Sequence, residues 1–329
     1  MVTSLTGRVV TVAGPIDPPD LGHTVTSVHL VSDMNGAATV IADKAPVTID
    51  RLGALALGAQ NEDDLRLSAE DVRSDLADFA AQGGGAVVDV TGVDQGRRPD
   101  ELARLAETTG VTVIMGCGGH APDRAPEALA DEIVREIHEG VNGVPAGVIG
   151  EIPTLDLDRP ADRAVATAVA DAARRTGAPV LIDRAATPTA THALLDLFAE
   201  RGADLGRIAV GHCDDLATDL DALAALADRG VFVQFDGLGR LSSVYREIDD
   251  QDVAAAVLDL AGRGHADRIL LSPNVSRKID LKAFGGGGYG FVAQQLVPYL
   301  RFTGADDALL DSITAANPRR WLTFTEGRG

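Results

Sequence analysis

The sequence has few cysteines, few basic residues and no long apolar run. Its two cysteines, Cys117 and Cys213, are too few for a disulfide framework in a chain of 329 residues. No apolar run approaches the length of a membrane span, and no signal-peptide pattern opens the chain. Lys and Arg together number 29 against 49 Asp and Glu, which gives a net charge of −20. That charge disfavours nucleic acid and anionic membranes as partners, because both are polyanions. We therefore expect a soluble, cytoplasmic protein.

A glycine-rich phosphate fingerprint is also missing after the first predicted strand, where a doubly wound dinucleotide-binding sheet would need one. Eight short apolar runs instead alternate with amphipathic helical segments. The runs cover residues 24–30, 86–90, 111–115, 147–151, 179–183, 207–212, 231–236 and 268–272. Eight β-then-α units in roughly 270 residues match the size of a (β/α)8 barrel. We predict an α/β fold, a single TIM-barrel domain over residues 1–329, with a short N-terminal arm or hairpin within residues 1–22.

Helix start and stop signals separate these strands. Ser68-Ala-Glu-Asp71 has the form of a capping box and predicts a helix that reaches about residue 82. Proline opens further helices at residues 99, 126 and 160, and the last helix is expected at about residues 292–302.

The run Gly147-Val-Ile-Gly-Glu151 ends in a carboxylate. An apolar run of this length between Gly and Pro suits a strand that is buried on both faces. A buried carboxylate costs several kcal/mol unless a cation or hydrogen-bond donors meet it. Glu151 therefore predicts a partner beside it.

Polar side chains stand at the end of most predicted strands, and in such barrels these ends converge on one mouth. A single residue of this kind is explained as a solvated side chain in a loop. Histidines and carboxylates at the ends of four different strands are less well explained by chance and indicate a shared site. Imidazole with carboxylate is the ligand mixture of zinc and similar divalent metals. The strand-end residues are Ser27, His29, Thr91, His120, Glu151, Asp183, Arg184, His212, Asp214, Asp236, Ser272 and Asn274.

Several longer segments carry a resemblance to a known family. They are residues 12–16 (Val-Ala-Gly-Pro-Ile), 20–29, 147–151, 207–214, 232–239, 269–274 and 286–290, and the terminal Asn317-Pro-Arg-Arg. In this order, over nearly the whole chain, they resemble the phosphotriesterase family of the amidohydrolase superfamily. The resemblance implies the same barrel and a hydrolase of organophosphates, lactones or other esters. It leaves the oligomeric state open, with a homodimer as one option because dimers are common among relatives.

The family's metal ligands are only partly present. The resemblance implies a binuclear centre on a His-x-His pair, a bridging lysine or glutamate, two further histidines and an aspartate. Here Ser27 replaces the first histidine, Asp183 the fifth-strand histidine and Asn274 the aspartate, whereas His29, Glu151 and His212 match. Serine and asparagine are poor metal ligands, so we expect no binuclear centre. At most one divalent ion is expected, zinc first, with manganese or iron as alternatives.

Roles follow for the candidate residues. Glu151, Asp183 and His212 are the predicted metal ligands, with His29 as a fourth. Because an amide cannot act as a base, Asn274 is expected to hold a water or substrate oxygen, and the base is sought among Asp183, His29 and His120. Substrate binding is assigned to Arg184, Ser27, Tyr289 and Arg277. Arg184 has the alternative of pairing with Asp183, and the cluster of Arg277, Lys278 and Lys282 the alternative of a solvated loop.

Three functions remain compatible with these residues. The first is a mononuclear metal hydrolase of a small lactone, ester or amide. The second is a metal-independent acid–base enzyme, a hydrolase, lyase or isomerase, in which grouped carboxylates raise one another's pKa. The third is a non-catalytic protein that binds a small ligand. The substrate cannot be deduced, because fold-level analogy does not reach past altered site residues.

Overall fold

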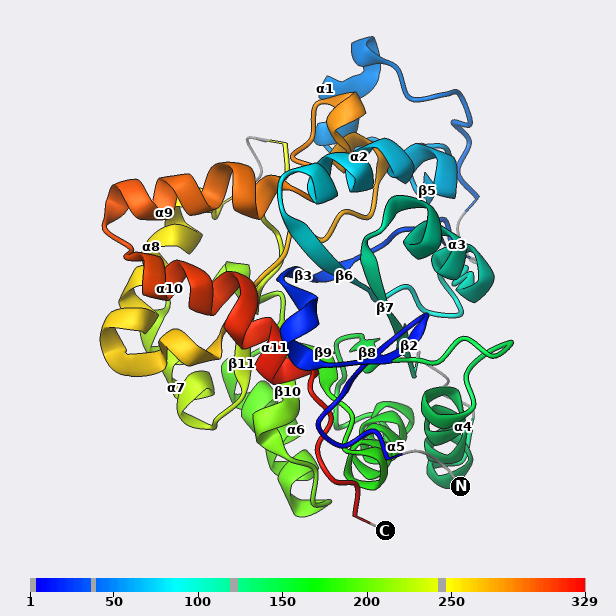
Figure 1. Ribbon diagram of the computed structural model, residues 1–329, viewed down its shortest axis with the longest axis vertical. Helices are drawn as coiled ribbons and strands as arrows, with labels where there is room; N and C mark the ends of the chain where they lie inside the picture. Colours follow the sequence, from blue (N-terminus) through cyan, green and yellow to red (C-terminus); the bar gives the residue numbers. More distant parts are fainter. Residues whose placement is uncertain (1–3, 37–39, 119–123, 242–246, 329) are drawn as a thin grey trace.

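The computed structural model describes residues 4–36, 40–118, 124–241 and 247–328. Its main sheet has eight parallel strands, nearly closed into a barrel (Figure 1). In spatial order these are β12 (Ile269–Leu271), β11 (Phe232–Phe235), β10 (Ile208–Gly211), β9 (Val180–Asp183), β8 (Val148–Ile152), β7 (Thr112–Cys117), β6 (Gly84–Asp89) and β3 (His23–Val28). Each coincides with a predicted strand to within two or three residues, so the predicted barrel is confirmed.

The barrel closes between β12 and β3 through side chains and loops. The Ser272 hydroxyl accepts a hydrogen bond from the Ser27 amide at 3.0 Å and donates one to the Ser27 carbonyl at 2.5 Å. The His29 amide donates to the Val275 carbonyl at 2.8 Å. Both serines are fully buried, so these bonds form in the absence of competing water.

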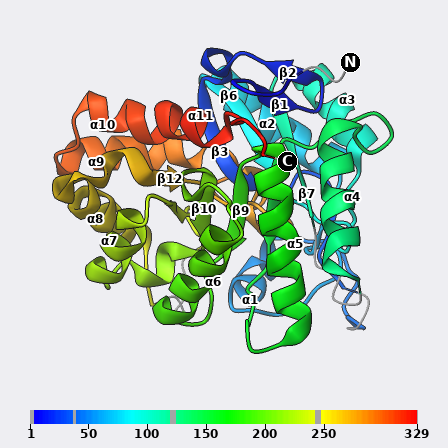
Figure 2. The same ribbon diagram turned by 90° about the horizontal axis from the view of Figure 1, so that it is seen from below.

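Helices separate the strands and cover the outside of the barrel (Figure 2). They are α2 (Ala69–Ala81), α3 (Pro99–Thr109), α4 (Pro126–His138), α5 (Pro160–Thr176), α6 (Pro188–Glu200), α7 (Leu220–Asp228), α8 (Asp250–Leu260) and α9 (Val297–Thr303). The capping box of α2 is confirmed, because the Ser68 amide donates to Asp71 at 2.9 Å and the Asp71 amide donates to the Ser68 hydroxyl at 3.3 Å. None of the described helices is long and apolar enough to cross a bilayer.

One prediction about the helices is wrong. The segment at 292–302 is not the last helix, because a wider turn at Val292–Leu296 leads into α9, and α10 (Asp307–Asp311) and α11 (Asn317–Leu322) follow. The physical reason is that Gly304, with φ 119°, ends α9, and Asp306 then caps a new helix by accepting from the Leu309 amide.

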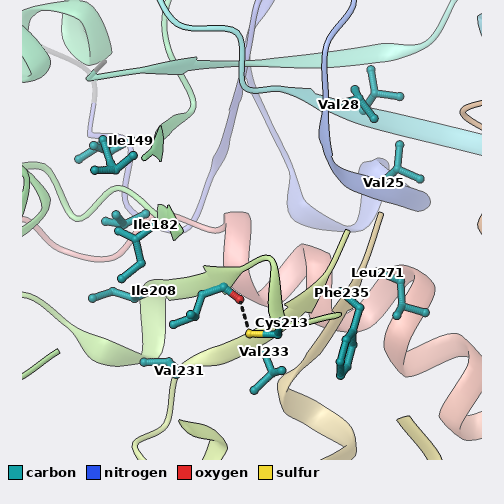
Figure 3. Packing of buried hydrophobic residues seen from close by; sticks show 14 of the residues in the cluster. Val25, Val28, Ile149, Ile182, Ile208, Cys213, Val231, Val233, Phe235 and Leu271 are labelled. Atoms are coloured by element: carbon teal, nitrogen blue, oxygen red, sulfur yellow. Dashed lines mark hydrogen bonds between the residues drawn. The ribbon is translucent and has the colours of Figure 1, made fainter. Parts of the chain in front are cut away.

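Alternation along the strands produces two cores. On β7, Val113 and Met115 point outward under the helices, whereas Ile114 points into the barrel. Figure 3 shows part of the outer core, where the Cys213 thiol donates to the Val210 carbonyl at 3.3 Å. The inner core contains Leu181, Ala209, Phe232, Leu270 and Trp321 among others. A filled interior confines the chemistry to the ends of the strands.

The predicted N-terminal hairpin is confirmed as β1 (Val9–Thr11) paired antiparallel with β2 (Gly14–Ile16). It passes directly against the start of β8. A Cβ added at Gly147 would lie 2.0 Å from the Val10 carbonyl oxygen, so this approach requires glycine.

A long excursion follows β3 and returns through the pairing of β4 (Ser32–Asp33) with β5 (Arg66–Leu67). It contains α1 (Leu52–Ala56), which lies beside the segment that follows β12 (Figure 1). The link is the fully buried Asp64, which accepts from Arg277 Nε at 2.7 Å and from the Ile279 amide at 3.1 Å. This contact fixes the excursion beside the mouth of the barrel.

Candidate active site

Glu151 lies near the end of β8, as the sequence predicts. The preceding Gly150 has φ 140°, and a Cβ there would lie 2.4 Å from the Leu181 carbonyl oxygen. Glycine at this position lets β8 approach β9 closely while the next side chain turns towards the mouth. The Glu151 side chain is 12% exposed, so it is nearly buried but reachable from the mouth.

Asp183 and His212 converge on Glu151 from the next two strands. Nε2 of His212 lies 3.4 Å from Asp183 Oδ1 and 3.6 Å from Glu151 Oε1. The side chain of Asp183 is 14% exposed and that of His212 is 35% exposed. The predicted carboxylate–carboxylate–imidazole cluster is therefore present at the carboxyl ends of β8, β9 and β10.

Asp236 is a member of the site whose role the sequence does not reveal. It is fully buried after β11, and its Oδ1 lies 2.7 Å from Nδ1 of His212. Its carboxylate also accepts from the His212 amide at 3.2 Å and from Gln234 Nε2 at 2.9 Å. Asp236 thereby fixes the ring of His212 so that Nε2 faces Glu151 and Asp183. The only sequence signal is its position at a strand end.

His212 is held in a strained backbone conformation. Its φ is 53°, in the left-handed region that few residues other than glycine adopt. The Asp236 carboxylate binds its amide, and Arg184 Nε donates to its carbonyl at 2.8 Å. Asn274, after β12, has φ 41°. Strained non-glycine residues of this kind cluster at functional sites and persist where their surroundings fix them.

The electrostatics of the cluster are those of a site short of positive charge. Burial, followed by the charge of Asp183, raises the pKa of Glu151 well above its ordinary value. Burial also raises the pKa of Asp183 to about 6, although the charge of His212 opposes this. Burial alone would lower the pKa of His212, but the carboxylates of Asp236, Asp183 and Glu151 raise it to about 10. Three acids thus surround one imidazole.

The donor set fits a divalent metal ion. Glu151 Oε1 and Asp183 Oδ1 are buried, and both face His212 Nε2, at 3.6 and 3.4 Å. Ligand atoms from Glu151, His212 and Asp236 also lie within 4.8 Å of one another. Asp183 suits a second carboxylate ligand better than Asp236 does, because both oxygens of Asp236 are already engaged by His212 and Gln234. A buried carboxylate on the far nitrogen of a histidine is a common outer-shell partner of metal-bound imidazole.

His29, Ser27 and Asn274 lie near the seam of the barrel. His29 is not part of the metal-like group found among the described residues, and its Nδ1 lies 3.0 Å from the Thr91 hydroxyl. Burial, followed by the charge of His212, lowers the pKa of His29 to about 3, so its ring is neutral at physiological pH. The Ser27 hydroxyl and the Asn274 Oδ1 atom are buried and have no hydrogen-bond partner among the residues that the structure describes. Ser27 contributes to barrel closure through its backbone amide and carbonyl, which bind the Ser272 hydroxyl.

Arg184 and Tyr289, which are predicted to bind substrate, contact the backbone of two histidines at the site, and the alternative pairing of Arg184 with Asp183 is wrong. The guanidinium of Arg184 donates to the His212 carbonyl and forms an ion pair with Asp215, not with Asp183. Tyr289 is fully buried, and its hydroxyl donates to the His29 carbonyl at 2.8 Å. Both residues therefore hold the backbone of histidines at the site. The predicted His120 lies outside the described residues.

A cavity of about 980 Å³ opens beside this cluster. Its wall includes His212 and two arginines, Arg240 and Arg277, together with apolar side chains such as Leu241 and Ile279. The basic cluster after β12 is neutralised within the fold: Arg277 pairs with Asp64, Lys278 with Asp63 at 2.8 Å, and Lys282 with Asp78. Arg277 thus lines the cavity from a position that Asp64 fixes.

Comparison with known proteins identifies the family of this chain. Residues 7–322 match the phosphotriesterase family. The rat and human N-acetyltaurine hydrolases are 32% and 30% identical, with 98% of this chain and 100% of each relative covered.

Solved structures give the same result. A resiniferatoxin-binding protein from Rhodobacter sphaeroides is 34% identical with a TM-score of 0.90, covering 96% of this chain and 95% of that one. The lactonase Lmo2620 from Listeria monocytogenes is 25% identical with a TM-score of 0.79, covering 97% and 100%. The Escherichia coli phosphotriesterase homology protein, solved with phosphate in its active site, is 28% identical with a TM-score of 0.78, covering 93% and 100%. The chain belongs to the phosphotriesterase family and is a phosphotriesterase-like hydrolase.

Proposed function

We propose that this hydrolase cleaves a small amide, lactone or ester with one divalent metal ion, zinc first among the candidates, held by Glu151, Asp183 and His212. The observation that carries the proposal is the convergence of two buried carboxylate oxygens, Glu151 Oε1 and Asp183 Oδ1, on His212 Nε2, at 3.6 and 3.4 Å. Two carboxylates that are buried beside a single imidazole are stabilised by a bound cation.

The substrate class is supported by the relatives. The names of the curated relatives specify N-acetyltaurine, an amide, and that of a solved structure specifies a lactonase. Both reactions are attacks of water on a carbonyl carbon. An N-acetyl amide and a small lactone are therefore the first substrates to test, and the cavity of about 980 Å³ has room for either.

The residues around the three proposed metal ligands have distinct roles. When bound, a divalent ion supplies Lewis-acid polarisation of a carbonyl and lowers the pKa of a water. Asp236 fixes the ring of His212, and Arg184 fixes its backbone, so the three ligands keep their geometry. The Asn274 amide can hold a water or substrate oxygen but cannot take a proton. The neutral His29 can supply only a hydrogen bond.

A metal-independent mechanism is the second candidate, and one observation favours it. Burial raises the pKa of Asp183 to about 6, close to physiological pH. A carboxyl group with such a pKa can serve as a general acid or base without a metal ion. The two mechanisms differ in their response to a chelator.

The test is the metal content of the purified, untagged protein by plasma mass spectrometry, together with hydrolysis of N-acetyltaurine and γ-lactones. Glu151→Ala and His212→Ala are compared with Asp158→Ala, an exposed carboxylate in the loop after β8. We expect about one metal ion per chain in the wild type and in Asp158→Ala and none in the two site variants. Activity should follow metal content, and a phosphotriester should not be turned over.

Two outcomes would contradict the proposal. Absence of stoichiometric metal, even after growth and refolding with added ions, would remove the metal mechanism. Hydrolysis that survives chelation and still depends on Asp183 would establish the second candidate instead.

We also propose that the enzyme works in the cytoplasm, since both cysteines are free thiols and such thiols persist in reducing compartments.

A further inference from the structure

The segment Asn317-Pro-Arg-Arg320 lies away from the proposed active site, against the residues that precede β10 and β12. It forms α11, which packs at the amino-terminal ends of the strands, opposite the mouth. The buried Asn317 side chain donates to the carbonyls of Ala266 at 2.8 Å and Ile269 at 2.9 Å. Trp321 Nε1 donates to the Arg207 carbonyl at 3.2 Å. The helix is therefore fixed beside the residues that precede β10 and β12.

This packing gathers arginines around a second cavity. A hollow of about 340 Å³ is lined by Arg207, Arg319 and Arg320 and by Pro18 and Pro19, which begin the short helix before β3. A volume of this size is at the lower end of small-molecule sites. Three arginines therefore line one cavity of a chain whose net charge is −20.

The positive charge of this cavity is only partly compensated. Asp267 accepts from Arg320 at 3.2 Å and lies 3.6 Å from the neighbouring Arg268. Within residues 4–36, 40–118, 124–241 and 247–328, neither Arg207 nor Arg319 forms an ion pair. Arg207 donates one guanidinium nitrogen to the Arg320 carbonyl, while its Nε is buried without a hydrogen-bond partner.

The charges also act on one another. Burial lowers the pKa of Arg207, the carboxylate of Asp204 opposes this, and the charges of Arg268 and Arg320 add to the lowering. The Asp204 side chain already accepts from the Gly206 amide at 2.9 Å. A buried donor without an acceptor beside like charges is a costly arrangement that a bound anion would relieve.

We propose that this arginine cavity binds a compact oxyanion of the phosphate type, at a site separate from the active site. Guanidinium groups present paired N–H donors that match phosphate oxygens, and two uncompensated arginines match the charge of a phosphate dianion. Inorganic phosphate and the phosphate group of a small metabolite share this chemistry. A bound phosphate would join α11 to the segment before β10.

Isothermal titration at constant ionic strength tests the proposal, with inorganic phosphate, sulfate and glycerol phosphate as probes. Arg207→Gln and Arg319→Gln are compared with Arg135→Gln, which changes an exposed arginine on α4. His212→Ala is included because a relative binds phosphate in its active site. Saturable phosphate binding that weakens by about tenfold or more in the two cavity variants, and not in the other two, supports the proposal.

Tighter binding of glycerol phosphate than of inorganic phosphate would identify a phosphorylated metabolite as the ligand. Absence of saturable binding, or binding lost in His212→Ala and retained in both cavity variants, would overturn the proposal. Because the Arg319 side chain is exposed, Arg319→Gln should fold like the wild type, and its thermal midpoint without phosphate verifies this.

Discussion

At the scale of single residues, the site depends on how His212 is held. Its ring and its backbone amide both bind Asp236, which itself is fully buried and fixed by Gln234. The position of the His212 ring thus depends on a residue that is itself fully buried.

Removing the charge of Asp236 should disable the site without unfolding the protein. Asp236→Asn keeps the side-chain volume but weakens the hold on Nδ1 of His212. We expect metal affinity or kcat to fall by about 10–100-fold. Metal titration and steady-state kinetics measure this, with Asp158→Asn as the control. Wild-type affinity and kcat in the variant would show that Asp236 does not position His212.

The sequence identifies Glu151, Asp183 and His212 because the barrel brings strand ends together whatever the details of packing. It places Asp236 at a strand end as well but assigns it no role. That role depends on how far each side chain reaches across to the adjacent strand, since the Asp236 carboxylate lies directly against the His212 ring. Register and side-chain direction of this kind are set by the packed fold and leave no local pattern.

A second residue-scale prediction concerns pH. His23, on β3, packs against Phe79 with the ring centroids 5.7 Å apart, and its Nε2 is buried with no partner in the described part of the chain. Burial lowers the pKa of His23 from 6.5 to about 4. The unfolded chain therefore binds a proton at this histidine below about pH 6.5 while the folded chain does not. Its contribution to stability is complete above that pH and is lost as the pH falls towards 4.

His23→Phe should remove this acid sensitivity. Between pH 6.5 and 4, the wild type should lose about 2–3 kcal/mol of unfolding free energy more than the variant. Urea unfolding at several pH values measures the difference, because carboxylates common to both proteins cancel. His138→Gln, at an exposed histidine of α4, should behave like the wild type. Parallel pH profiles for the wild type and His23→Phe would refute the assignment.

At the scale of elements, the eight strands follow from apolar runs, because strands covered on both faces leave a continuous apolar signal. What the runs do not show is how the sheet closes. The Ser272 hydroxyl bonds the Ser27 amide and carbonyl across the seam, and this depends on which strands become neighbours. The prediction from sequence also omits α10 and α11, because the signals that end α9 and begin α10, Gly304 and Asp306, lie beyond the predicted last helix.

Ser272→Ala tests the seam. The substitution leaves a buried amide and a buried carbonyl of Ser27 without their partner, so the unfolding free energy should fall by about 1–3 kcal/mol. Urea unfolding measures it, with Ser74→Ala on the exposed face of α2 expected to change stability by less than about 0.5 kcal/mol. Equal effects of the two substitutions would mean that the barrel closes without the Ser272 bonds.

At the scale of the whole molecule, the cavity of about 980 Å³ beside the active site is assembled from segments that are far apart in sequence. The excursion after β3 supplies Ala56, the loop after β11 supplies Leu241, and the segment after β12 supplies Arg277 and Ile279. Asp64 joins the first of these to the last. The basic cluster at 277–282 is visible in the sequence, but its neutralisation by Asp63, Asp64 and Asp78 is not, because those acids lie some 200 residues earlier.

Asp64→Asn should therefore loosen the mouth as well as weaken the fold. The amide oxygen can still accept a hydrogen bond from Arg277, but the ion pair is lost. Because the guanidinium is partly exposed, the unfolding free energy should fall by only about 2–3 kcal/mol. Because Arg277 and Ile279 line the cavity while Glu151, Asp183 and His212 sit on other strands, KM should rise with metal content unchanged. Asp50→Asn, at an exposed position in the same excursion, should leave both quantities as in the wild type. A loss of metal in Asp64→Asn would instead show that the excursion supports the ligands themselves, and an unchanged KM would show that the cavity wall does not contact the substrate.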